Sequence, residues 1–163
     1  EIEERVRAVL ESTGVPFGIF EIDPDFADTA AFCQKYGYAL GESGNTIIVA
    51  SKKEPKQYCA CVVRASTRLD VNHAVADLMG IRKLSFASAE ETVALTGMMI
   101  GGVTIFALPE DLPIYVDEGL MGLDSVILGS GSRSSKVKVS PDVFHRLPNA
   151  KVIAGLATEP PAP

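Results

Sequence analysis

The sequence predicts a mixed α/β fold: a compact sheet, curved or barrel-like, with helices around it. Segments with helical and with extended periodicity alternate irregularly along the 163 residues. Two β-branched segments, 45–50 and 58–63, flank a short polar loop typical of a hairpin, which disfavours a doubly wound parallel sheet. The length fits one domain with a single core. We assign this domain to residues 1–157 and expect a Pro-rich tail over 158–163.

Helices are expected where apolar residues recur at helical spacing between capping signals. These segments are 1–13, 28–38, 70–79 and 88–95, and Ser88 with Glu91 forms a capping box at the start of the last one. A further helix is expected after Ser140, because Pro141 stands at its first position. Strands are expected at 17–22, 45–50, 58–63, 83–86, 112–116, 125–128, 136–139 and 152–153.

The charge of the chain restricts its partners. A net charge of −6 disfavours non-specific nucleic-acid binding, which depends on neutralising phosphates. Two local basic clusters, in segments 52–56 and 133–138, are interpreted as solvated surface. No run of about 18 apolar residues occurs, so no transmembrane helix is expected. The charged, amphipathic first segment does not have the pattern of a signal peptide.

The cysteines predict a cytoplasmic protein without a structural metal. Their number, three, is odd, which favours a reducing compartment over a disulfide framework. Cys59 and Cys61 alternate onto one face of an expected strand, but neither a second cysteine pair nor closely spaced histidines accompany them. We therefore interpret them as buried core thiols, and we expect neither a metal nor an organic cofactor.

Segment 101–133 is the candidate functional region, because it holds glycine-rich stretches at 101–102 and 129–132 on either side of an expected strand. Glycine occurs where the backbone turns tightly or where a ligand approaches it closely. The second stretch could form a nest of N–H groups for an anion or carbonyl oxygen, or a plain turn. Asp117 could bind a ligand or cap a short helix over 118–121, and the residues alone favour the cap.

The order and spacing of five motifs resemble the YbaK and prolyl-tRNA synthetase editing-domain family, also called ProX or INS-like. The motifs are NTIIV from Asn45, RLDV from Arg68, LTGMMIGGVT from Leu95, LPIYVDE from Leu112 and GSGSR from Gly129. The resemblance runs from about residue 27 to 157. It implies a compact mixed α/β fold and hydrolysis of the ester that joins a wrong amino acid to tRNA, without a cofactor.

The resemblance also implies roles for individual residues. The partner would be the acceptor end of an aminoacyl-tRNA, with a tRNA synthetase as a further candidate partner. Asp117 would bind the substrate α-amine or position water, and backbone N–H groups near the glycines would stabilise the developing oxyanion. The predicted catalytic residues are Asn45, Asp117, Gly101 and Gly102, and the predicted substrate-binding residues are Thr46, Thr104, Ile105, Gly129, Ser130, Gly131, Ser132 and Arg133.

Two positions depart from the family pattern. A Lys is common in the family where this chain has Asn45, and the family's G-x-x-x-P element ends here in Ile105. The first hypothesis is a free-standing deacylase that edits mischarged tRNA in trans. The alternative is a degenerate module that binds tRNA or a synthetase without hydrolysis. Hydrolysis of another small ester or amide is a third hypothesis.

Overall fold

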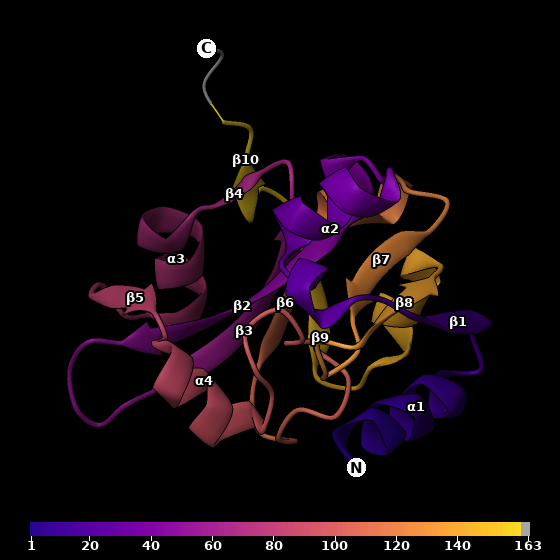
Figure 1. The fold of residues 1–163 in the computed structure, drawn as a ribbon. Coiled ribbons are helices and arrows are strands. Elements are labelled where there is room, and N and C mark those ends of the chain that lie inside the picture. Colours follow the sequence, from indigo (N-terminus) through magenta and orange to yellow (C-terminus); the bar gives the residue numbers. More distant parts are fainter. Residues whose placement is uncertain (161–163) are drawn as a thin grey trace.

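The computed structural model describes residues 1–160, which form a mixed α/β fold around a five-stranded sheet (Figure 1). The order of its strands is β5 (Leu84–Phe86), β2 (Gly44–Ser51), β3 (Tyr58–Arg64), β6 (Ile114–Asp117) and β9 (Ala150–Ile153). β2 is antiparallel to β3 and β5, whereas β6 is parallel to β3 and β9. The expected hairpin and the expected mixed sheet are both confirmed.

A second, antiparallel sheet has the order β1 (Phe17–Glu21), β8 (Ser135–Val139) and β7 (Val126–Gly129). A parallel bridge between Ser43 and Ile127 joins it to the beginning of β2. The two sheets thus form one curved surface that does not close into a barrel within the described part of the chain. β4 (Arg68–Leu69) and β10 (Ala157–Thr158) form a separate short ribbon, which the sequence did not predict.

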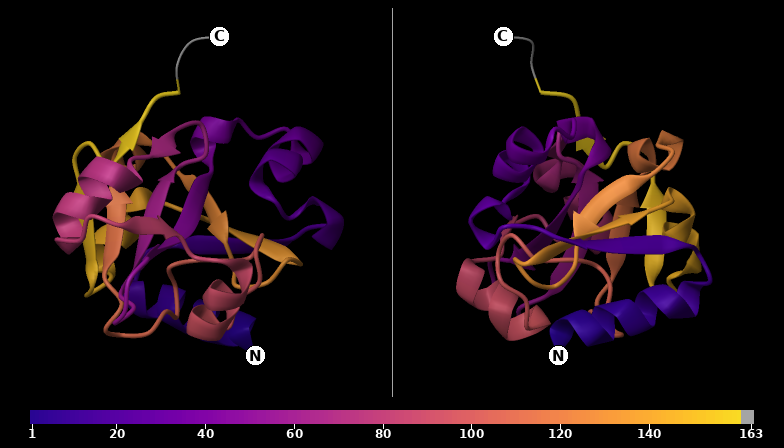
Figure 2. Two further views of the ribbon diagram at one scale, coloured as in Figure 1. Left: turned by 90° about the vertical axis from the view of Figure 1, so that its left-hand side faces the viewer. Right: turned by 45° about the vertical axis from the view of Figure 1, so that its right-hand side comes forward.

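The four predicted α-helical segments are present, with ends shifted by one or two residues. They are α1 (Ile2–Thr13), α2 (Thr29–Tyr36), α3 (Ala76–Met79), which continues a π-helical turn over Val71–Val75, and α4 (Ala89–Thr96). The Ser88–Glu91 capping box of α4 forms as predicted. Segments 24–26, 40–42, 118–122 and 141–146 form 3-10 helices. α1 runs along the base of the molecule, beneath β1 (Figure 2).

Three hydrophobic clusters hold these elements together. The largest fills the space between the two sheets and α1, with Leu10, Phe106 and Phe144 at its centre. The second lies between the five-stranded sheet and α3, and it contains Cys59 and Cys61, which are buried as expected. The third is an aromatic group around α2: Phe20, Phe32, Tyr36 and Tyr38. This third cluster supports the floor of the site described below.

Thr158, the first residue of the expected tail, pairs with Arg68 in the β10–β4 ribbon. The last three residues of the expected tail, 161–163, lie outside the described residues. Over residues 1–160, no helix combines the length and apolar character that crossing a membrane requires.

Candidate functional site

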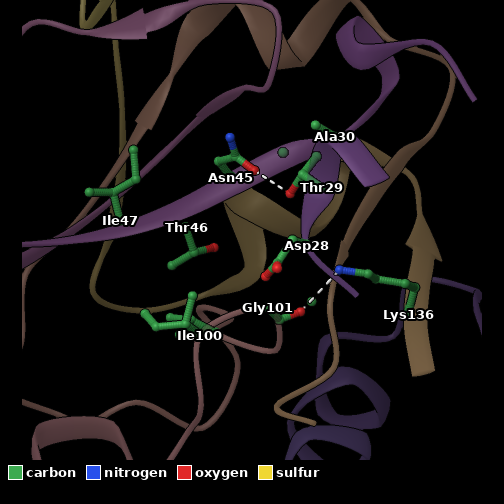
Figure 3. A pocket seen from close by; sticks show the side chains of 12 residues that line it. Asp28, Thr29, Ala30, Asn45, Thr46, Ile47, Ile100, Gly101 and Lys136 are labelled. Carbon is green, nitrogen blue, oxygen red and sulfur yellow. Dashed lines mark hydrogen bonds between the residues drawn. The ribbon is translucent and has the colours of Figure 1, made fainter. Parts of the chain in front are cut away.

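A polar cavity of about 340 Å³ lies between β2, the start of α2 and the loop around Gly101 (Figure 3). Four of the predicted site residues, Asn45, Thr46, Gly101 and Gly129, line it. The others that line it are Asp28, Thr29, Ala30, Gly44, Ile47, Ile100, Val103 and Lys136.

β2 presents an unpaired backbone edge to this cavity, because β5 covers only residues 49–51. Ser51 N–H donates to Gln57 O, and Ala65 N–H donates to Ser43 O. The backbone N–H and C=O groups of the odd-numbered residues of β2 therefore point toward β3. The carbonyl of Ile48 points the opposite way and accepts from Ala87 N–H. Since peptide groups alternate along a strand, the N–H and C=O of Thr46 also point away from β3. They form no backbone hydrogen bond within residues 1–160 and remain available to a ligand.

The side chains of this edge are polar but uncharged. The Thr46 hydroxyl is buried and has no hydrogen-bond partner among the described residues. It is directed across the cavity toward Asp28 (Figure 3). The amide oxygen of Asn45 accepts a hydrogen bond from the Thr29 hydroxyl at 2.6 Å, which fixes the side chain against α2. An unpartnered buried hydroxyl is unfavourable by about 1–3 kcal/mol, so the Thr46 side chain is a locally unfavourable group in the wall of the cavity.

Lys136 supplies the positive charge in the cavity, although the sequence placed it on a solvated surface. Its side chain is buried, and Nζ donates to Ala27 O at 2.6 Å and Gly101 O at 3.1 Å. The ammonium also lies 5.4 Å from the centre of the Phe32 ring. Burial lowers the pKa of Lys136 to about 8 from an ordinary 10.5, and the nearby Asp28 carboxylate opposes part of this shift.

Arg133 holds two walls of the cavity together. Its guanidinium pairs with Asp28 Oδ1 at 3.0 Å and donates to Ile100 O at 2.7 Å and to Pro24 O at 2.9 Å. Together with Lys136 it therefore joins segment 24–28 to segment 100–101. All three of these acceptors are protein atoms, so Arg133 links two segments of the cavity wall to each other.

The glycines allow a close approach of two backbone segments. A side chain at Gly102 would meet the backbone of Ser132 at 2.7 Å, and one at Gly129 would meet Val103 O at 2.5 Å. Two N–H groups of the turn are occupied: Gly131 donates to Gly102 O at 2.7 Å, and Ser132 donates to the Ser130 hydroxyl at 3.4 Å. Of the two interpretations of stretch 129–132, these bonds favour the turn over an anion nest.

Eight predicted site residues do not line the cavity. Gly102 and residues 130–133 belong to the adjoining turn and clamp described above, and the other three belong to other parts of the fold. Asp117 is buried, and its carboxylate accepts from Gly119 N–H at 2.9 Å and from Ala157 N–H at 3.1 Å, so it caps the 3-10 helix as the residues alone favoured. Thr104 is buried near Met98, whose sulfur accepts from its N–H. Ile105 belongs to the main core and lines a different cavity.

Eight lining residues were not predicted as site residues, and Asp28 and Lys136 are the two charged ones among them. Asp28 precedes a helix and has the appearance of a cap, but its side chain makes no capping bond and pairs with Arg133 instead. Lys136 and Lys138 occupy equivalent positions in an alternating strand, yet only Lys136 is buried. The burial of Lys136 could not be predicted from local sequence, because the residues that bury its side chain belong to α2, far away in the chain. Within residues 1–160, no group of three or more His, Cys, Asp or Glu side chains could hold a metal ion.

An apolar cavity of about 190 Å³ adjoins the polar one and shares four of its lining residues: Thr46, Ile47, Ile100 and Val103. Ile48, Phe86, Ala87 and Thr92 complete its walls. Phe86 and Ile100 are 59% and 50% exposed at its rim. In Figure 3, Asp28 and Lys136 lie to the right of Thr46, Ile47 lies at its upper left, and Ile100 lies below it. Asp28 and Lys136 line only the polar cavity, and Phe86 and Ala87 line only the apolar one. The two cavities therefore extend in different directions from the open edge of β2.

Comparison with known proteins relates this chain to aminoacyl-tRNA editing domains. The chain is 26% identical over 130 residues to YwhH of Bacillus subtilis (strain 168), described as uncharacterized, covering 78% of this chain and 82% of the relative. The crystal structure of the hypothetical protein APE2540 superposes with a TM-score of 0.83 at 25% identity, covering 94% of this chain and 99% of that one. A candidate trans-editing enzyme for prolyl-tRNA synthetase superposes with a TM-score of 0.80 at 26% identity, covering 98% of both chains.

The family model of the aminoacyl-tRNA editing domain matches residues 23–147. This match includes α2, β2, the loop around Gly101, and β7 and β8, which are the elements that form the polar cavity. The order and spacing of the sequence motifs predicted this relationship. The chain therefore belongs to the aminoacyl-tRNA editing domain family.

Proposed function

We propose that this protein is a trans-acting editing hydrolase that removes a wrongly attached amino acid from tRNA by hydrolysing the ester bond. The observation that carries the proposal is the meeting of the open β2 edge with Asp28 and Lys136 in one cavity. Family membership makes an aminoacyl ester the substrate to consider first. We place the activity in the cytoplasm, which suits the three free, buried cysteines.

Thr46 N–H is the proposed donor to the ester carbonyl oxygen. When water attacks the carbonyl carbon, negative charge develops on this oxygen. The bond to the ribose oxygen then breaks, and that oxygen takes up a proton. A preorganised backbone donor at such a position contributes about 10²–10³-fold to a rate. Thr46 fits because its peptide group is held by strand pairing on one side and is open on the other.

Asp28 and Lys136 supply the charges of the proposed site. Asp28 Oδ1 is bound by Arg133, while its side chain remains 63% exposed and can accept a hydrogen bond from the α-ammonium of the amino acid. This is one of the two roles that the family resemblance implied for Asp117. The Lys136 ammonium holds Gly101 in place and provides the positive charge that Asn45 lacks.

The proposal is tested by incubating the purified protein with a panel of aminoacyl-tRNAs and measuring the loss of the ester. We expect hydrolysis of at least one of them. Lys136→Met should lower kcat/KM by about 10- to 100-fold, as expected for hydrogen bonds from a charged group. Lys138→Met is the matched control, because Lys138 is exposed on the same strand and contacts the ring of Tyr38.

The second candidate function is a module that binds tRNA or a synthetase without hydrolysis, and the uncharged Asn45 favours it. The same panel separates the two. Activity that appears only in Asn45→Lys would show a degenerate site, whereas activity of the parent protein excludes it. A panel left untouched by both proteins contradicts the hydrolase.

A further inference from the structure

We infer that the apolar cavity beside the polar one binds the adenine ring of the 3′-terminal nucleotide of tRNA, stacked on Phe86. The inference rests on the proposed function, because it assumes an aminoacyl ester at the open edge of β2. An aminoacyl-adenosine has an amino acid on one side of the carbonyl and a nucleoside on the other. Two cavities meet at Thr46, one for each part.

The polar cavity suits the amino acid end. Its charged groups include Asp28, which attracts an ammonium, and the neighbouring loop carries Asp23 and Asp25. Asp23, Asp25 and Asp28 against Arg133 and Lys136 leave a net charge of −1 on this side, which favours an ammonium over a phosphate. The nucleotide is therefore expected in the apolar cavity, toward Ile48 and Phe86, which do not line the polar one.

The apolar cavity has the character of a base-stacking site. Its walls are aliphatic and aromatic apart from Thr46 and Thr92, and the Phe86 ring stands 59% exposed at its mouth. Bases stack on aromatic side chains through their π-faces, and such stacking needs no specific hydrogen bond. The mouth also opens to solvent, as it must if a polynucleotide is to leave the site.

Basic residues continue from Phe86 along the surface. β5 is antiparallel to β2, and Lys52 N–H donates to Lys83 O at 2.9 Å, so the residues before Phe86 lie beside the turn after β2. Exposed Lys52, Lys53, Arg82 and Lys83 form this basic strip, with Glu54 as an acidic neighbour in the turn. In a protein of net charge −6, a strip of this sign is where phosphates preceding the terminal base would lie.

The test uses an RNA hairpin with a single-stranded CCA 3′ end that carries no amino acid. Its binding to the protein is measured by fluorescence anisotropy. A second hairpin has an abasic 3′-terminal nucleotide. Phe86→Ala should weaken binding of the CCA hairpin by about 5- to 150-fold, the range for loss of one stacked base. Phe86→Tyr should retain binding. Val93→Ala is the matched control, because Val93 is 45% exposed on neighbouring α4 and does not line the cavity.

The loss of affinity caused by removing the terminal base from the RNA should not add to the loss caused by removing the Phe86 ring from the protein. The abasic hairpin should therefore bind the parent protein and Phe86→Ala equally. The inference is overturned if the parent protein does not distinguish the two hairpins, or if Phe86→Ala binds the CCA hairpin as tightly as the parent.

Deacylation rates separate this inference from the proposed function. Phe86→Ala should slow hydrolysis of different aminoacyl-tRNAs by the same factor. A factor that depends on the amino acid would assign the cavity to the amino acid side chain, which overturns the adenine site and leaves the hydrolase standing. Phe86-dependent RNA binding without any hydrolysis would refute the hydrolase and support the adenine site.

Discussion

Lys136 illustrates how burial changes the chemistry of a common surface residue. Its ammonium group lies near two backbone carbonyls and the Phe32 ring, and the ionisable groups around it are Asp28, Arg133 and Cys33. Desolvation disfavours the ammonium and lowers its pKa to about 8, while Asp28 partly compensates. A lysine in this position carries a charge that changes near physiological pH.

The stability of the protein should therefore rise with pH between about 8 and 10.5. In this interval the unfolded chain still binds the Lys136 proton and the folded chain has released it, so the free energy of unfolding increases with pH. The gain should approach about 2–3 kcal/mol. It is measured by urea unfolding at several pH values, comparing the parent with Lys136→Met, which should lack this component. Parallel pH curves for the two proteins would contradict the assignment.

At the scale of elements, the site depends on two features. One is the unpaired edge of β2, and the other is the tight contact between the loop at 100–103 and the turn at 129–132. β5 ends at Phe86, opposite Val49, and no strand replaces it along residues 44–48 of β2 within the described chain. An open strand edge invites pairing with another chain. Here the loop at 100–103, held against the turn 129–132, lies over that edge and restricts access to a cavity.

Gly129→Ala should disturb this arrangement, because the new methyl group would press against Val103 O and Gly102 O, which are backbone atoms and cannot rotate away. We expect a loss of about 1–3 kcal/mol in the free energy of unfolding and a larger fractional loss of deacylation. Gly122→Ala is the control, since a methyl group there meets no atom within 4 Å. Similar behaviour of the two variants in denaturation and activity assays would exclude the close contact as the cause.

The elements themselves could be predicted well because their signals are local. Hydrophobic periodicity, the capping box at Ser88 and the β-branched hairpin strands all act within a few residues, and the structure contains each of them. The β4–β10 ribbon was missed because its strands are two residues long and pair across the chain. The cavity was predicted in part for a related reason. Asn45 and Thr46 carry a motif, whereas Asp28 and Lys136 gain their roles only from packing.

At the scale of the whole molecule, the core includes elements outside the region matched by the family model. α1 precedes residue 23, yet Val6 and Leu10 are fully buried in the main cluster between the two sheets. Ile2 and Val6 also lie against Gly131, behind the turn that forms one side of the site. The first helix is therefore part of the folding unit and supports the cavity from below.

Leu10→Ala should lower the free energy of unfolding by about 2–5 kcal/mol, the range for a buried leucine replaced by alanine. Chemical denaturation followed by circular dichroism measures it. Glu11→Ala, one position away on the exposed face of α1, should change stability by no more than about 0.5 kcal/mol. A Leu10→Ala protein as stable as the parent would show that α1 is not part of the cooperative core.

The walls of the polar cavity come from stretches far apart in the chain, around residues 28, 45, 101, 129 and 136. During synthesis, a chain that has not yet reached β8 has neither Lys136 nor the partner that places β1 in its sheet. Such non-local pairing forms late and slowly. Because binding requires every stretch in place, a bound ligand stabilises the entire domain by RT ln(1 + [L]/Kd). Thermal protection by the aminoacyl end of a tRNA thus reports on the completed fold as well as on the site.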